Sequence, residues 1–120
     1  MIAYTNGESA GRPWGYWRVL AVQRGAVVKY LEINPRSRLS LQRHFKRAER
    51  WIVTTGTATV QIGQEEYELN PGDSIYIPCR AWHRLGNRTR RPVAVVEVQL
   101  GDDLSEDDIE RLEDDYERCE

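Results

Sequence analysis

The residues best suited to chemistry lie in two segments that together hold both histidines of the chain. In the first, Gln42 and His44 are followed by Glu49; the second contains His83. Residues two apart on a strand point to one face, so Gln42 and His44 should project together. Two imidazoles, a carboxylate and an amide oxygen form a mixed nitrogen and oxygen ligand set. The sequence therefore predicts one divalent metal ion bound by these four residues.

This ligand set also restricts the kind of metal. It suits zinc, iron(II), manganese, cobalt or nickel better than calcium or copper(I), and we expect zinc. Four protein ligands still leave coordination positions open for substrate or water. The alternative is that each histidine is an ordinary hydrogen-bonded residue, but both histidines of the chain at ligand-like spacings favour the metal site.

The segments around these residues are typical of an all-β protein. Short runs rich in Val, Ile, Trp, Tyr and Thr are separated by Gly, Pro and Asn, which predicts many short strands in a sandwich or barrel. Tight turns are expected at Gly63-Gln64 and at Asn70–Asp73. The clearest strand runs are Gly15–Leu20, Val27–Ile33, Trp51–Thr55, Thr57–Ile62, Glu66–Leu69, Ser74–Pro78 and Pro92–Leu100.

The last of these runs carries a polar pair that could face the interior. Strict alternation places Glu97 and Gln99 on one face and Val96 and Val98 on the other. We expect the polar pair inside, where burial requires hydrogen bonds or contact with a ligand. The opposite register would expose both residues to solvent. With the pair inside, Glu97 and Gln99 are plausible substrate contacts.

The last twenty residues differ in charge and period from the rest. They contain eleven acidic residues and two arginines, whereas the other hundred residues contain fifteen basic and eight acidic residues. The basic body favours an anionic ligand. Ser105 can cap a helix, and Ile109, Leu112 and Tyr116 follow it at helical spacing. We therefore predict an acidic amphipathic helix over about 105–118.

Size and composition limit the class of protein. The chain has 120 residues, of which 40% are hydrophobic and 30% charged, which predicts one globular domain over residues 1–120 with its barrel over about 12–100. The absence of a long apolar run and of a signal peptide predicts a cytoplasmic protein with no membrane partner. Cys79 and Cys119 lack metal or redox spacing and are expected to be thiols. No nucleic-acid-binding motif accompanies the arginines, so no nucleic-acid partner is expected.

The two histidine segments resemble the paired motifs of the cupin superfamily. Further segments, including RPWG, RLSLQRH, RAERWIVTTGTA, HRL, EVQLG and DDIERLEDDY, resemble the mannose-6-phosphate isomerase domain of type II enzymes, which join this domain to a guanylyltransferase. The resemblance extends from Arg12 to Arg118. It implies a cupin-type double-stranded β-helix, or jelly-roll barrel, expected here as a stand-alone domain.

The same resemblance implies an enzyme that interconverts mannose 6-phosphate and fructose 6-phosphate through a cis-enediol. A metal ion would act as a Lewis acid on the oxygens at C1 and C2. Arg47 matches the arginine of the family's HxHRxE stretch, which implies a catalytic role in stabilising the enediolate or binding phosphate. Lys46, Glu97 and a metal-bound water are candidates for proton transfer. Arg84 is the second candidate for binding phosphate.

The sequence departs from the family pattern close to the predicted metal. Phe45, Lys46 and Arg50 replace histidines that are usual in type II enzymes. Arg80 stands at the usual glycine of the second motif, where a positive φ would be strained. These changes leave open a non-catalytic cupin that binds a sugar or sugar phosphate; a third possibility is an iron-dependent cupin dioxygenase. A homodimer is expected because small β-domains with an exposed edge strand often pair.

Overall fold

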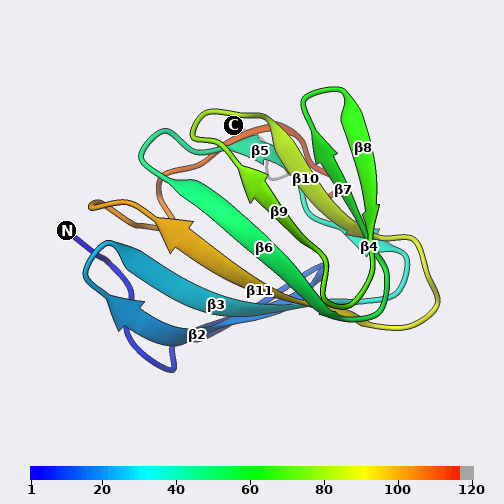
Figure 1. The fold of residues 1–120 in the computed structure, drawn as a ribbon, viewed down its shortest axis with the longest axis horizontal. Coiled ribbons are helices and arrows are strands. Elements are labelled where there is room, and N and C mark those ends of the chain that lie inside the picture. The colour runs from blue at the N-terminus through cyan, green and yellow to red at the C-terminus, as the bar shows by residue number, and fades with distance from the viewer. Residues whose placement is uncertain (117–120) are drawn as a thin grey trace.

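The protein consists of two antiparallel β-sheets that form the two layers seen in Figure 1. The computed structural model describes residues 1–116. The first sheet has the order β1-β2-β3-β11-β6-β9, and the second has the order β12-β5-β10-β7-β8, with β4 paired to β10. Within the described residues there is no helix, so the all-β prediction is confirmed.

The strand bounds follow the predicted runs and add several short strands to them. The first sheet contains β1 (Ser9–Arg12), β2 (Gly15–Gln23), β3 (Ala26–Ile33), β11 (Val93–Leu100), β6 (Ala48–Thr55) and β9 (Ser74–Ile77). The second contains β12 (Glu110–Glu113), β5 (Leu41–Arg43), β10 (His83–Asn87), β7 (Ala58–Ile62) and β8 (Glu65–Leu69), with β4 (Ser37–Arg38) beside it. Five of these, β1, β4, β5, β10 and β12, were not among the clearest runs in the sequence.

The hydrophobic core is built from the inward faces of both sheets. In β3 every second residue is buried, and the same alternation continues in β6 and β11. The core cluster includes Trp14, Trp17 and Trp51 together with Val95 from β11 and Leu85 from β10. The strict period of two therefore decides which side chains reach the space between the sheets.

The predicted turns are confirmed. Gly63-Gln64 joins β7 to β8 as a two-residue hairpin. In the next turn the Asp73 amide donates to the Asn70 carbonyl at 2.9 Å. Arg80 adopts a φ of 71°, the left-handed conformation that a glycine would tolerate more easily. Cys79 is an exposed free thiol, and Cys119 lies outside the described residues.

The predicted C-terminal helix is wrong for the residues that the structure describes. Residues 105–109 form a loop, and β12 follows it as a strand paired with β5. Pairing with β5 satisfies backbone groups that an edge strand would leave open, and this outweighs the helical spacing of the apolar residues. Acidic side chains support the arrangement, because Glu110, Glu113 and Asp115 form ion pairs with Arg43, Arg84 and Arg38. The last two residues of the predicted helix fall outside residues 1–116.

No helix capable of spanning a membrane was found in the described part of the chain.

Candidate metal centre

Three of the four predicted metal ligands form a buried cluster between the two sheets. The candidate ligand atoms of His44, Glu49 and His83 all lie within 4.8 Å of one another. The Nε2 atom of His44 is 3.3 Å from Glu49 Oε2, and Nε2 of His83 is 4.0 Å from Glu49 Oε1. Glu49 comes from β6 in the first sheet, whereas His83 begins β10 and His44 follows β5 in the second. The cluster therefore bridges the two layers.

The outer nitrogens of both histidines are held by backbone carbonyls. His44 Nδ1 lies 2.6 Å from the Asp108 carbonyl, and His83 Nδ1 lies 2.9 Å from the Ala81 carbonyl. A carbonyl can only accept, so each Nδ1 carries the proton and donates, and each Nε2 keeps its lone pair. This is the orientation that second-shell carbonyls give to metal-binding histidines.

The electrostatics of the cluster also fit a metal ion. Burial lowers the pKa of His44 to about 4 and lowers that of His83, so both imidazoles are neutral at pH 7, as ligands must be. His83 Nε2 is buried without a hydrogen-bond partner, although a buried acceptor normally has one. An ion between these nitrogens and the Glu49 carboxylate would satisfy it. The residues present therefore fit the predicted divalent metal.

Gln42, the fourth predicted ligand, lies next to the cluster in the second sheet. It pairs directly with His83 across β5 and β10, and it lines the same cavity as His44. Its Oε1 accepts a hydrogen bond from Ser40 Oγ at 2.9 Å. Gln42 as a ligand stays a prediction.

Arg47 packs directly against the cluster. This buried guanidinium donates from Nε to Glu49 Oε2 at 2.7 Å, and its Nη2 lies 3.2 Å from His44 Nε2. Its Nη1 donates to the Ser105 carbonyl at 3.0 Å. Burial alone would raise the pKa of Glu49, but Arg47, the two histidines and a hydrogen bond with Glu97 together outweigh it and hold that pKa well below the ordinary value. A full negative charge is thus kept at the centre of the cluster.

A hydrogen-bonded chain extends from the cluster along β11. Trp51 Nε1 donates to Glu49 Oε1 at 2.9 Å and to Glu97 Oε1 at 3.2 Å, and Gln99 Nε2 donates to Glu97 Oε2 at 3.0 Å. Glu97 and Gln99 are both buried, so the predicted interior register is confirmed. Burial first, and then the nearby Glu49 charge, raise the pKa of Glu97 to about 8. Burial and the neighbouring carboxylate thus both favour the protonated form of Glu97.

The cluster opens onto a small polar cavity of about 60 Å³. Gln42, His44, Arg47 and Glu97 contribute to its wall on the metal side. Charged and apolar side chains complete it, namely Arg12, Trp14, Trp17, Lys29, Leu31, Leu39, Glu106, Ile109 and Arg111. A larger hollow of about 460 Å³ lies elsewhere, over Arg36, Arg38, Arg84 and Arg88, and contains none of the clustered residues.

Residues 105–109, which we call the cover loop, close one side of this cavity. Besides the carbonyls of Ser105 and Asp108, the Asp108 carboxylate accepts from the backbone amides of Phe45 and Lys46, both at 2.9 Å. Glu106 accepts from Lys29 Nζ at 2.6 Å. The loop is thus bonded both to a metal-ligand segment and to the basic side of the cavity.

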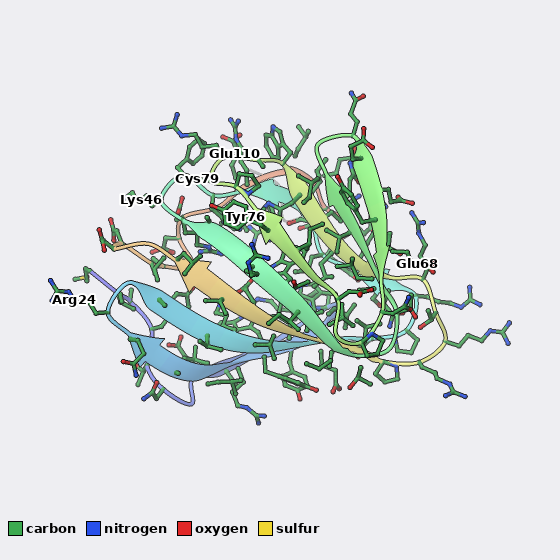
Figure 2. The ribbon with its side chains drawn as sticks, viewed as in Figure 1. Arg24, Lys46, Glu68, Tyr76, Cys79 and Glu110 are labelled. Atoms are coloured by element: carbon green, nitrogen blue, oxygen red, sulfur yellow. The ribbon has the colours of Figure 1, made fainter. Side chains whose placement is uncertain are left out.

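Three residues predicted to act on or bind the substrate do not line the cavity. Gln99 is fully buried and donates to Glu97. Lys46 is exposed and donates to Asp103 at 3.0 Å; Figure 2 shows it at the periphery of the molecule. Arg84 follows His83 on β10 and lies beside Glu113 and the Leu39 carbonyl, to which it donates. Alternation along the strand turns it away from the cluster.

Two cavity residues were missed from the sequence. Lys29 lies on the buried face of β3, and a charged residue at an apolar position of an alternating strand was a readable signal. Arg111 was hidden because it falls in the segment predicted as a helix.

Comparison with protein families matches residues 3–114 to the mannose-6-phosphate isomerase C-terminal family. The alginate biosynthesis protein AlgA of Pseudomonas aeruginosa is 46% identical over 107 residues. The mannose-1-phosphate guanylyltransferase ManC of Salmonella typhimurium is 42% identical over the same length. Each alignment covers 89% of this chain, but this chain spans only 22% of either relative.

Solved structures show the same fold at lower identity. A cupin-2 domain from Rhodospirillum rubrum, Rru_A2000, aligns with a TM-score of 0.66 and 21% identity, covering 78% of this chain and 67% of that one. A sugar phosphate isomerase of the cupin superfamily from Silicibacter pomeroyi aligns with a TM-score of 0.61 and 22% identity, covering 70% and 59%. The predicted cupin fold is confirmed.

Proposed function

The chain belongs to the mannose-6-phosphate isomerase C-terminal family of cupin domains, and from this premise we propose that it interconverts mannose 6-phosphate and fructose 6-phosphate with a divalent metal ion. The observation that carries the proposal is the buried cluster of His44, Glu49 and His83 with Arg47 packed against it. The relatives are about five times longer than the aligned segment, so their other activities are not transferred to this chain. The proposal concerns only the activity of the matched domain.

In this proposal Gln42, His44, Glu49 and His83 hold the ion, with zinc as the first candidate. When bound, it would supply Lewis-acid polarisation of the sugar oxygens at C1 and C2. The protein keeps both histidines in the ligand tautomer through the Asp108 and Ala81 carbonyls. It also excludes bulk water, because all three clustered side chains are buried.

Arg47 is the proposed catalytic cation. Its guanidinium is fixed by Glu49 and the Ser105 carbonyl and lines the cavity, so it needs little reorganisation to face negative charge that develops on the sugar. Arg47 is buried, and a charge interaction at a buried position is stronger than one at the surface.

Glu97 is the proposed proton-transfer residue. It lines the cavity, is oriented by Trp51 and Gln99, and has a pKa raised by burial and by the nearby Glu49 charge. A group with a pKa near the working pH can both donate and accept a proton during one turnover. Lys46 is a weaker candidate, since its ammonium is paired with Asp103 at the surface.

Two of the three residues that replace family histidines, Lys46 and Arg50, lie away from the cavity wall. Lys46 is paired with Asp103, and exposed Arg50 lies over the ring of Tyr76 with its Cζ 5.4 Å from the centroid. Neither side chain contributes to the cavity wall. This favours an enzyme over a binding module that has lost its chemistry.

Substrate entry in this proposal requires the cover loop to move. A cavity of about 60 Å³ has room for a few water molecules but not for a hexose phosphate. The loop is joined to the rest of the site through Ser105, Glu106 and Asp108 rather than through a strand ladder. Segments of this kind are the usual lids of closed sites.

The test is conversion of mannose 6-phosphate to fructose 6-phosphate by metal-stripped protein, before and after zinc, cobalt, manganese or iron(II) is restored. We expect turnover only with metal, and its loss in Glu49→Gln and Arg47→Lys. Arg43→Gln, a change in an arginine beside Gln42 that is paired with exposed Glu110, is the matched control and should retain activity. Stoichiometric metal without turnover under any of these conditions would refute the proposal.

A further inference from the structure

Arg111 is a half-buried cation on the cavity wall, and within residues 1–116 its side chain forms no ion pair. Its Nε is buried and lacks any hydrogen-bond partner. Burying such an N–H unsatisfied is costly, and burying an unpaired charge costs more. The position is therefore suited to an anionic group that is supplied by a ligand.

The other cations of the cavity each have a carboxylate partner, although two of them share one carboxylate. Arg47 is paired with Glu49 at 2.7 Å and Lys29 with Glu106 at 2.6 Å. Arg12 lies 3.9 Å from Glu106 and over the Trp17 ring. Among these four, only Arg111 has no ion-pair partner and a buried N–H without a hydrogen-bond partner in the described part of the chain, so it marks the anion-binding end of the cavity.

Strand pairing fixes Arg111 at a defined distance from the metal cluster. It is the direct partner of Gln42, and Gln42 is the direct partner of His83, so the three form one row across β12, β5 and β10. Paired residues point to the same face and their Cα atoms are about 5 Å apart, which puts Arg111 and His83 about 10 Å apart at Cα. A ligand that contacts both Arg111 and the metal cluster must therefore have its anionic group several bonds away from its reacting carbon atoms.

We propose that Arg111 binds the phosphoryl group of a sugar phosphate whose carbonyl end lies at the His44, Glu49 and His83 cluster; this deepens the proposed function and rests on it for the sugar. The planar guanidinium presents paired donors to phosphate oxygens. Arg111 lies on β12, outside the cover loop, so it keeps its place on the wall while that loop moves. It takes the role predicted for Arg84, which is bonded to Glu113 and Leu39 instead.

The experiment compares binding of mannose 6-phosphate and of mannose to metal-loaded protein by calorimetry, in wild type, Arg111→Gln, Arg111→Lys and Arg43→Gln. Arg43 lies next to Gln42 on β5 and is paired with exposed Glu110, so its variant makes the same charge change outside the cavity. We expect Arg111→Gln to weaken mannose 6-phosphate binding at least about tenfold and to leave mannose binding and metal affinity unchanged. Arg111→Lys should lose less, and Arg43→Gln less than about twofold.

Each other outcome has a defined meaning. Equal affinity of wild type and Arg111→Gln for mannose 6-phosphate overturns the inference, even if the enzyme turns over. Selective binding of mannose 6-phosphate through Arg111 without turnover supports it and refutes the isomerase proposal alone. Competition by acetate as strong as that by inorganic phosphate overturns the phosphoryl assignment. If Arg111→Gln fails to show a cooperative unfolding transition, the Arg111→Lys affinities decide.

Discussion

Paired strands and the cover loop build the site, but they hold their side chains by different means. The paired strands β6, β10 and β11 carry Glu49, His83 and Glu97, and we call them the strand wall. β11 is paired along its whole length with β3 and along most of it with β6, and its inward residues are buried. The cover loop has no ladder and is fixed by isolated bonds from Ser105, Glu106 and Asp108. The paired strands therefore fix the geometry of the ligands, whereas the cover loop can open.

This difference explains how one small domain can hold the metal cluster rigidly and still let a substrate reach it. Residues in a continuous ladder open only with much of the sheet, whereas a loop held by a few bonds opens locally at lower free energy. His44 is the point where the two walls meet, because its Nδ1 is bonded to the loop and its Nε2 faces Glu49. The predictions below test each wall in turn.

The largest effect is expected for Glu49→Gln in the strand wall. The change removes the charged ligand and leaves Arg47 buried without its ion-pair partner, so metal binding should be lost and the free energy of unfolding should fall by about 3 kcal/mol. Metal content and urea unfolding of metal-free protein measure the two effects separately. Exposed Glu68→Gln on β8 is the control, and a full metal complement in Glu49→Gln would contradict the proposed ligand set.

Arg47→Lys should affect catalysis more than metal binding. Lysine keeps the charge but loses the fork that contacts Glu49, His44 and Ser105, so turnover should fall by about 100-fold or more while the bound metal is retained. Steady-state rates and metal analysis of the same preparation check this. An unchanged rate would remove Arg47 from the catalytic residues.

The strand wall could be predicted from the sequence because strand alternation and ligand spacing involve only residues close together in the chain. Alternation placed Glu97 and Gln99 on one face, the family resemblance favoured the interior register, and the spacing of Gln42 and His44 located the ligand segment. The cover and β12 could not be predicted in this way, because their apolar residues have helical spacing and the pairing partner β5 lies more than sixty residues away. Hence Arg111 was missed.

Asp108→Ala tests the cover loop itself. The variant loses the carboxylate that accepts from Phe45 and Lys46, an arrangement like a helix cap, so the loop should be destabilised by about 1 kcal/mol. Hydrogen exchange of the backbone amides at 105–109 should become about fivefold faster, while amides of β11 stay unchanged. Faster exchange in β11 as well would show that the two walls open together, against the comparison drawn above.

The smallest expected effect is a pH dependence at the hinge between the loop and the basic side of the cavity. Burial by itself would raise the pKa of Glu106, but the Lys29 ammonium and its hydrogen bond outweigh it, so the pKa of Glu106 is lowered. A carboxyl group whose pKa is lower in the folded state stabilises the protein above its unfolded pKa of about 4.5, and this stabilisation is lost as the pH falls.

Glu106→Gln should therefore remove part of the acid destabilisation expected below pH 4.5 and leave the stability profile near neutral pH parallel to that of wild type. Thermal unfolding of metal-free protein across this range, with exposed Glu110→Gln as control, measures it. Because the Glu106 side chain is 40% exposed, solvent screening keeps the effect small. A profile identical to wild type would mean that the Lys29 bond does not hold the loop, and that Ser105 and Asp108 alone fasten the cover to the strand wall.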